Sequence, residues 1–246
     1  MIICVKNNKE QKMIDIHNHS LFGVDDGADT LEETIAMTQA ASKQGVTDIF
    51  MTPHFRHGMF PYDKDLIEQN YLRAREEADR IGVNLYLGCE YHADSEMLDN
   101  YRSNRIHSAG DTAFILCEFS HSTPVNAIRN VIRDATSSGY LPIIAHAERY
   151  EVFQSDPELA AEMQAIGAMI QCNADSVLGI DGKLLQKTTK KLLKKGLVDF
   201  IASDAHGIDE RANHMADAEK FITRKYGEDT AYILFEDNPA RIIDLI

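Results

Sequence analysis

The sequence predicts an α/β fold in which parallel strands alternate with helices, and it favours closure of the sheet into a barrel. Two observations carry this prediction. Short apolar runs alternate with longer amphipathic stretches along the whole chain, which indicates a parallel sheet. Reactive side-chain types recur directly after six of the seven apolar runs, as expected where barrel strands converge at their carboxyl ends. Strand number alone leaves an open doubly wound sheet possible.

The elements follow from the apolar pattern in chain order. Strands are predicted over residues 13–16, 47–51, 84–87, 113–117, 141–145, 168–172 and 199–202. Helices are predicted over residues 30–44, 63–81, 94–104, 124–138, 156–166, 183–195, 209–226 and 228–245. The first helix has the clearest boundaries, because Thr30 and Glu33 match a capping box and Gly45 suits a helix C-terminus.

The chain of 246 residues, 44% of them hydrophobic, is long enough to bury one sizeable core. No linker or repeat divides it, so we predict a single domain over residues 13–246. Residues 1–12 are predicted to be an N-terminal extension, unless translation begins at Met13. No apolar run approaches the ~20 residues of a membrane span, and the run at residues 1–5 is too short for a signal peptide. We therefore predict a cytoplasmic protein that is not an integral membrane protein.

Charge and cysteine content exclude further classes. The net charge of −14, from 25 basic and 39 acidic residues, argues against nucleic acid as a partner, because phosphate backbones need a positive footprint. The four cysteines are widely spaced and form no C-x-x-C pair, so reduced and largely buried thiols are expected: Cys4, Cys89, Cys117 and Cys172.

The strongest local signal follows the first predicted strand. His17 and His19 are two residues apart in an extended segment, so both imidazoles can reach one cation. Alone, this H-x-H pattern is weak. Asp25 and Asp26 come next, and either they form only a turn before a helix or one carboxylate returns to the histidines.

Further candidate ligands follow the later strands, and each could also be an ordinary solvated side chain. They are His54, Glu90, Glu118, His146, Asp204 and His206. Together with His17, His19 and Asp26 they supply N and O ligands without a thiolate, a set that suits Mn²⁺, Zn²⁺ or Fe²⁺ rather than a structural zinc. Crowded carboxylates also need cations to offset their repulsion. The remaining histidines, expected to be surface or supporting groups, are His57, His92, His107, His121 and His214.

These motifs, in this order, resemble the PHP (polymerase and histidinol phosphatase) superfamily. The match is closest to the CpsB/CapC-type bacterial manganese-dependent protein tyrosine phosphatases, which are associated with capsular and exopolysaccharide synthesis. The Gly-Val-Asp-Asp-Gly segment at residues 23–27 is the most distinguishing part. The resemblance runs from Met13 to about Arg211. It implies a distorted, TIM-like (β/α)₇ barrel, the PHP fold.

The resemblance also implies a site with three divalent cations, with Mn²⁺ expected and Fe or Zn as alternatives. One cation would be held by His17, His19, Glu90 and Asp204, a second by Glu90, Glu118 and His146, and a third by Asp26, His54 and His206. Arg149 and Arg211 match the positions that grip the substrate phosphate. The implied reaction is in-line attack of a metal-bound hydroxide on phosphotyrosine. The implied substrate is a phosphotyrosine protein, the tail of a membrane-associated tyrosine kinase that controls polysaccharide export.

Two rival functions stay open at this stage. One is another phosphoesterase of the same superfamily, such as a histidinol-phosphate phosphatase, and the other is a non-catalytic module that binds phosphotyrosine. Cysteine-based tyrosine phosphatases are excluded, because no cysteine is followed by an arginine six positions later. Aromatic residues at 55–62 and Tyr91 could line a pocket for a phosphotyrosine ring, or belong to ordinary loops and core. The general acid and the oligomeric state are undetermined.

Overall fold

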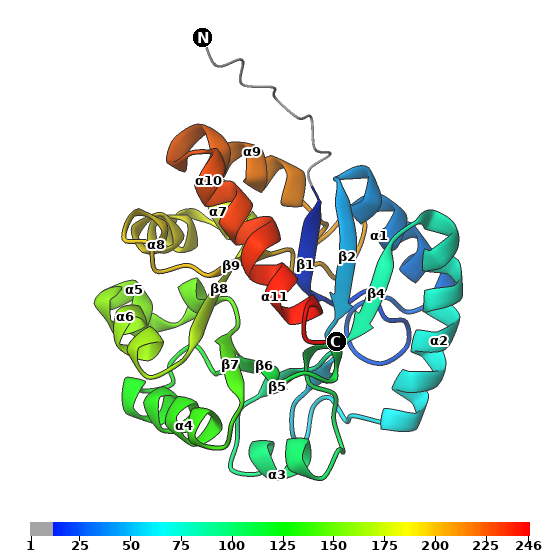
Figure 1. Ribbon diagram of the computed structural model, residues 1–246, viewed down its shortest axis with the longest axis horizontal. Coiled ribbons are helices and arrows are strands. Elements are labelled where there is room, and N and C mark those ends of the chain that lie inside the picture. Colours follow the sequence, from blue (N-terminus) through cyan, green and yellow to red (C-terminus); the bar gives the residue numbers. More distant parts are fainter. Residues whose placement is uncertain (1–11) are drawn as a thin grey trace.

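Parallel strands curl into an inner ring in the computed structural model, which describes residues 12–246 (Figure 1). The predicted extension therefore lies almost entirely outside the described residues. All strand pairs are parallel, in the orders β1-β2-β4 and β3-β5-β6-β7-β8-β9. The strands are β1 (Met13–Asn18), β2 (Val46–Met51), β3 (His54–Phe55), β4 (Asn84–Leu87), β5 (Glu90–His92), β6 (Phe114–Glu118), β7 (Leu141–Ile144), β8 (Met169–Asn173) and β9 (Phe200–Ala202).

Within residues 12–246 the strands occupy the seven predicted barrel positions, two of which are broken. Pro53, which has no N–H to donate, lies between β2 and β3, and Gly88 lies between β4 and β5. The last strand adjoins the first, because His19 N donates to Ala205 O at 2.9 Å and Asp204 N donates to His17 O at 2.9 Å. The predicted distorted (β/α)₇ barrel is confirmed.

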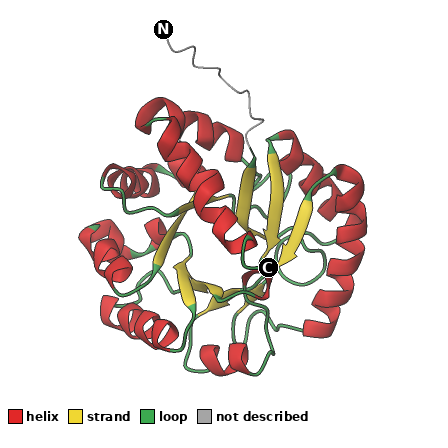
Figure 2. Cartoon of the chain, viewed as in Figure 1, coloured by secondary structure: helices red, strands yellow, loops and turns green. Residues whose placement is uncertain are grey.

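Helices surround this ring, as Figure 2 shows by colour. The α-helices are α1 (Leu31–Lys43), α2 (Lys64–Ile81), α3 (Met97–Arg102), α4 (Val125–Ser137), α5 (Glu151–Ser155), α6 (Glu158–Ala165), α7 (Ala174–Leu178), α8 (Lys183–Lys194), α9 (Met215–Tyr226), α10 (Glu228–Tyr232) and α11 (Asn238–Ile243). Short 3₁₀ turns are η1 (Ala109–Asp111) and η2 (Ala147–Arg149), and η3 (Ile233–Asp237) is π-helical.

The predicted helix boundaries are confirmed where capping residues mark them and are wrong elsewhere: the helix predicted over residues 94–104 spans only Met97–Arg102, and the short helices α5 and α7 were not predicted. Glu33 N donates to Thr30 Oγ1 at 3.2 Å, and the Glu33 side chain accepts from Thr30 N, so the capping box is present. The helix predicted to start at residue 209 begins only at Met215. The intervening loop carries Arg211 with φ of +48°, which lies outside the right-handed helical region.

The inside of the barrel is filled by apolar side chains at the amino ends of the strands. Ile14, Phe114 and Phe200 pack there with Ile242 of α11. Figure 1 shows α11 lying across the ring of strands, so this helix closes the barrel on that side. A second apolar layer between strands and outer helices includes Ile128. The predicted ligand side chains lie at the opposite, carboxyl ends of the strands. No helix within residues 12–246 has the length and apolarity needed to cross a membrane.

Candidate metal centre

The predicted ligand side chains converge at the carboxyl ends of the strands. Within the described part of the chain, three groups of side chains place their ligand atoms within 4.8 Å of one another. The groups are His17, His19, Glu90 and Asp204; His54, Glu90 and Glu118; and His19, Asp26, His54 and His206. Because His19, His54 and Glu90 each belong to two groups, the three form one continuous cluster.

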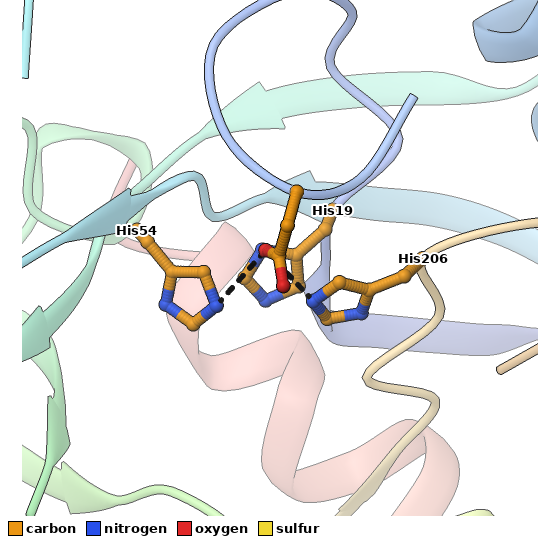
Figure 3. A group of neighbouring side chains, drawn as sticks. His19, His54 and His206 are labelled. Atoms are coloured by element: carbon orange, nitrogen blue, oxygen red, sulfur yellow. Dashed lines mark ion pairs between the residues drawn. The ribbon is translucent and has the colours of Figure 1, made fainter. Parts of the chain in front are cut away.

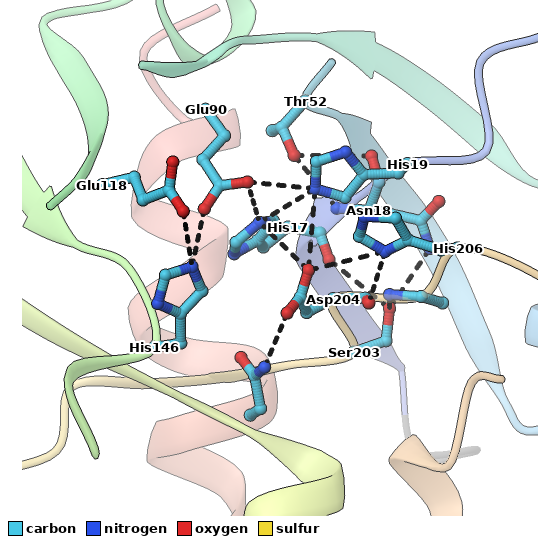
Figure 4. A network of polar contacts seen from close by, with 12 residues as sticks. His17, Asn18, His19, Thr52, Glu90, Glu118, His146, Ser203, Asp204 and His206 are labelled. Carbon is cyan, nitrogen blue, oxygen red and sulfur yellow. Dashed lines mark hydrogen bonds and ion pairs between the residues drawn. The ribbon is translucent and has the colours of Figure 1, made fainter. Parts of the chain in front are cut away.

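The first group is buried at the centre of the cluster (Figure 4). Glu90 Oε2 lies 3.1 Å from His17 Nε2 and 3.2 Å from His19 Nε2. Asp204 Oδ1 lies 3.5 Å from His17 Nε2 and 3.6 Å from His19 Nε2. These four side chains are the set that the family resemblance implies for one cation.

The second group lies beside Glu90 and differs in one member from the implied set. Glu90, Glu118 and His146 were expected to share a cation. His146 Nε2 lies 2.7 Å from Glu90 Oε1 and 4.0 Å from Glu118 Oε1 (Figure 4). His54 Nδ1, 3.0 Å from Glu90 Oε2, is the histidine whose ligand atom falls within the compact group. His146 therefore borders this group while His54 completes it.

The third group is drawn in Figure 3, and its carboxylate is half exposed. Asp26 Oδ1 is 3.4 Å from His54 Nε2 and 3.4 Å from His206 Nε2. The rings of His19 and His206 stack with centroids 3.9 Å apart. This group contains the implied Asp26, His54 and His206, with His19 added.

A second observation, independent of the spacing, indicates that the cluster suits divalent cations. Three of its buried polar atoms form no hydrogen bond within residues 12–246: Glu90 Oε2, His54 Nδ1 and His206 Nε2. Each of these atoms lies 3.0–3.4 Å from an ionisable neighbour in the cluster but without hydrogen-bond geometry, and a buried polar atom without a hydrogen bond is costly. Cations bound among these N and O atoms would satisfy them, and the ligand types suit Mn²⁺, Fe²⁺ or Zn²⁺.

Electrostatics hold the buried histidines and carboxylates in a charged state. Burial alone lowers the pKa of His17, but the carboxylates of Glu90 and Asp204 outweigh it and raise that pKa to about 9. His54 behaves alike: burial lowers its pKa, and Glu90 raises it to about 9. Burial raises the pKa of Glu90, yet the positive charges of His17 and His54 bring it well below its usual range.

For two histidines at the edge of the cluster, burial outweighs the neighbouring carboxylates and the pKa is lowered. Burial, reinforced by the charge of Arg149, lowers the pKa of His146 to about 4. Burial together with the charge of His19 lowers the pKa of His206 to about 4. Both imidazoles are therefore neutral at pH 7, the state that can ligate a metal.

Asp25 returns to the histidines and supports the cluster, which is one of the two alternatives that the sequence left open for this pair of carboxylates. Its Oδ2 lies 2.8 Å from His19 Nδ1 and accepts from His54 N at 3.0 Å. The return of this loop depends on Gly27, because a Cβ there would lie 1.8 Å from His19 O. Adjacent carboxylates thus have different positions: Asp25 is buried behind His19, and Asp26 is half exposed in the third group.

Arg149 and Arg211 both lie beside Asp204. Arg149 Nη1 is 2.9 Å from Asp204 Oδ2, and Arg211 Nη2 is 3.3 Å from Asp204 Oδ1. Arg211 is also 3.6 Å from Asp26, and its side chain is 43% exposed. Asp204 itself has φ of +52°, and such strained conformations persist at functional sites. Two guanidinium groups therefore border the cluster on one side.

Several secondary predictions are resolved by burial. Cys89, Cys117 and Cys172 are buried free thiols, as predicted, whereas Cys4 lies outside the described residues. His107 is buried between Glu68 and Asp111 and away from the ligand groups, so the expectation of a surface or supporting histidine is wrong there. Tyr91 is fully buried and cannot line an open pocket.

The chain resembles known proteins over nearly its whole length. The model of the family described as "Capsular polysaccharide synthesis, CpsB/CapC" matches residues 13–244. The chain belongs to the CpsB/CapC family. It is 34% identical over 238 residues to the tyrosine-protein phosphatase CpsB of Streptococcus agalactiae, covering 94% of this chain and 98% of that protein. It is 31% identical over 227 residues to the tyrosine-protein phosphatase YwqE of Bacillus subtilis, covering 92% and 89%.

Solved structures agree with the CpsB/CapC assignment. The chain superposes with a TM-score of 0.88 and 29% identity on a chain from the crystal structures of YwqE from Bacillus subtilis and CpsB from Streptococcus pneumoniae, covering 95% and 96%. Those proteins are described as unique metal-dependent tyrosine phosphatases. The phosphotriesterase homology protein of Escherichia coli matches with a TM-score of 0.56 and 13% identity, covering 94% of this chain and 98% of that one, which shows the barrel fold alone.

Proposed function

We propose that this chain is a metal-dependent protein tyrosine phosphatase whose active site is the cluster around Glu90. The observation that carries the proposal is the joining of three N and O ligand groups, through shared side chains, next to two arginines. Tyrosine phosphatase is also the function given to the relatives CpsB and YwqE.

We further propose that the cluster holds three divalent cations, with Mn²⁺ as the first choice. His17, His19, Glu90 and Asp204 would hold one, and Asp26, His54 and His206 another. Glu118 and His146, with Glu90 between them, would hold the third. Cations bound there would lower the pKa of a coordinated water and neutralise phosphate oxygens.

The two arginines would bind the substrate phosphate. Guanidinium groups form paired, charge-assisted hydrogen bonds with phosphate oxygens, which fixes both position and orientation. Arg149 and Arg211 already neighbour a carboxylate of the cluster, so an oxyanion placed there would meet donors from two directions. In a chain of net charge −14, these guanidinium groups together with the proposed cations would supply the local positive charge that a phosphate needs.

An aromatic side chain at the edge of the site would favour an aryl phosphate. Phe60 is partly exposed, and its ring stacks on His54 with centroids 4.9 Å apart and planes 16° from parallel. A phosphotyrosine ring could pack against this surface, whereas a serine side chain would leave it uncovered. A tyrosine leaving group, with a pKa near 10, also needs less help from a general acid than an alkyl alcohol does.

The natural substrate would be a phosphotyrosine protein connected with capsular or exopolysaccharide synthesis, in keeping with the family description. We propose the phosphorylated tail of a membrane-associated tyrosine kinase as that substrate, and the cytoplasm as the location of the reaction.

A substrate panel tests this function. Mn²⁺-loaded protein would be assayed on para-nitrophenyl phosphate, a phosphotyrosine peptide, a phosphoserine peptide and histidinol phosphate, before and after chelation. Chelator-sensitive turnover of the first two, weakened in Arg149→Ala and lost in His206→Ala, is expected. Preference for histidinol phosphate would instead identify another phosphoesterase. Metal binding without turnover of any substrate would instead support a non-catalytic module that binds phosphotyrosine.

A further inference from the structure

Strand β8 contributes no predicted metal ligand, yet it carries two buried amides that contact ligands from other strands. Gln171 and Asn173 are 0% and 1% exposed. They lie two residues apart, so their side chains project from the same side of the strand, and Gln171 Nε2 donates to Asn173 Oδ1 at 2.8 Å. Buried amides must satisfy both their donors and their acceptors, so the orientation of each is informative.

One backbone N–H group fixes the orientation of both amide side chains and of the hydrogen bonds that link them. His146 N lies 2.7 Å from the Gln171 side chain, and a backbone N–H can only donate, so the atom facing it is the oxygen Oε1. His17 Nδ1 lies 3.2 Å from that same oxygen. Nδ1 of His17 must therefore carry a hydrogen, and its other nitrogen, Nε2, is the one left to bind a cation among Glu90 and Asp204.

At the other end of this series of hydrogen bonds, Asn173 contacts one particular oxygen of Asp204. Since Asn173 Oδ1 accepts from Gln171, its Nδ2 faces Asp204 and donates to Oδ2 at 2.8 Å. Arg149 Nη1 also lies 2.9 Å from Oδ2, and Oδ1 faces His17 Nε2 and His19 Nε2 as well as Arg211 Nη2. Asn173 N donates in turn to the buried Glu148 Oε1 at 3.0 Å, which anchors the amide pair to the segment that carries His146.

We propose that Gln171 and Asn173 are positioning residues of the metal centre. They hold His17 with its hydrogen on Nδ1 and hold Asp204 with Oδ1 directed to the cation, and thereby raise metal affinity without touching the metal. The proposal rests on the proposed metal centre. Residues that orient ligands in this way typically change metal affinity by about 10–100-fold when they are replaced.

The test compares two substitutions of similar size at one position. Gln171→Leu removes both hydrogen bonds to the ligand segments, whereas Gln171→Glu keeps an acceptor for His17 and His146 N. The full chain would be titrated with Mn²⁺ in competition with a chelator, and its melting temperature measured in excess chelator. We expect Gln171→Leu to weaken Mn²⁺ binding by about 10–100-fold and Gln171→Glu to weaken it less.

Asn100→Leu is the matched control. Asn100 is also buried, and its Nδ2 donates to Tyr91 Oη at 2.9 Å rather than to a predicted ligand. The Asn100→Leu substitution should lower the melting temperature and leave Mn²⁺ affinity unchanged. Equal loss of affinity in Asn100→Leu and Gln171→Leu would overturn the proposal, as would wild-type affinity in Gln171→Leu.

A further variant covers the case in which Gln171→Leu does not fold. Asn173→Asp keeps the size and the acceptor of Asn173 but loses the donor to Asp204, so affinity should fall by at least about 10-fold. Wild-type affinity in Asn173→Asp would overturn the proposal. A wild-type protein that binds no Mn²⁺ in the same titration would instead refute the metal centre itself.

Discussion

Neighbouring side chains in this protein have sharply different environments, and Asp25 and Asp26 show it best. Asp26 is half exposed between His54 and His206, in the position of a ligand. Asp25 is buried, and its carboxylate contacts His19 on the side away from the cluster. A carboxylate that contacts the second nitrogen of a ligating histidine fixes the tautomer and raises its basicity.

Asp25→Asn should therefore weaken metal binding without unfolding the protein. Asparagine has nearly the same shape but presents no negative charge to His19 Nδ1. We expect Mn²⁺ affinity, and kcat/KM at limiting Mn²⁺, to fall by about 10–100-fold. Exposed Asp29 in the same loop supplies the control, since Asp29→Asn should alter neither quantity. Unchanged Mn²⁺ affinity in Asp25→Asn would contradict this role.

The charged histidines make metal binding depend on pH. With no metal bound, His17 and His54 have pKa values of about 9 and are protonated at neutral pH, so a cation must displace those protons. Mn²⁺ affinity should rise by about tenfold per pH unit for each proton released, and level off near pH 9. Titrations between pH 6.5 and 8.5 measure this slope. A slope of zero would show that neither histidine loses a proton to the metal.

The same raised pKa values have the opposite consequence for the metal-free protein. A histidine whose pKa is higher in the folded state stabilises the fold fully below its unfolded value, near 6.5, and that stabilisation is lost as pH rises through 9. Melting temperatures of chelated protein should accordingly fall between pH 7 and 9.5. A constant melting temperature over that range would contradict the charge pairing around Glu90.

At the scale of elements, the site depends on how loops return to the strand ends. The loop after β1 folds back so closely that Gly23 N donates to Ala28 O at 2.8 Å and Ala28 N donates to His19 O at 3.2 Å. This return is what brings Asp25 behind His19 and Asp26 over the cluster. Its sequence signal is the glycine that ends the Gly-Val-Asp-Asp-Gly segment.

Gly27→Ala should open this loop. The added Cβ would lie 1.8 Å from His19 O, so the backbone must move. We expect a loss of about 1–3 kcal/mol in unfolding free energy, typical of overpacking, together with loss of most phosphatase activity. Denaturant unfolding and phosphotyrosine assays measure the two effects. Gly139→Ala is a control for destabilisation alone: a Cβ there meets open space, but the φ of +87° strains alanine, so stability should fall while activity is kept. Full activity in Gly27→Ala would show that the loop return is not needed.

Helix α1 provides the contrasting case of an element that affects stability alone. Thr30→Ala removes the cap at Glu33 N and should cost about 1 kcal/mol of unfolding free energy. The cap is exposed, and its hydrogen bonds do not involve the ligand residues, so kcat/KM should be unchanged. A parallel fall in activity would mean that the start of α1 positions the Asp25 loop after all.

Sequence reasoning located these elements well because strand ends and caps have local signals. It missed what depends on distant partners. Gln171 and Asn173 are amides of unremarkable type, and only the fold brings them against His17 and Asp204. His107 was expected to be a surface or supporting histidine, and its burial depends on Glu68 of α2, which is far away in the sequence, as well as on the nearby Asp111. The short helices α5 and α7, each of five residues, fall below the length at which apolar periodicity is visible.

At the scale of the whole molecule, the barrel separates stability from chemistry. Apolar side chains and α11 fill one end, and the ligand cluster occupies the other. The carboxylates in that cluster add to a net charge of −14, so the proposed cations would relieve repulsion as well as support catalysis. The fold class and the family were accessible from the sequence because both depend on strand order and on motifs at strand ends.

The most direct test of the central claim is phosphate release from a phosphotyrosine peptide by wild-type protein and Glu90→Gln, with and without Mn²⁺. Glu90 is the carboxylate shared by two ligand groups. We predict turnover that stops on chelation and returns with Mn²⁺, and a folded Glu90→Gln variant reduced by more than about 100-fold, beyond what supporting residues contribute. Turnover that survives chelation, or a Glu90→Gln variant as active as wild type, would contradict the account.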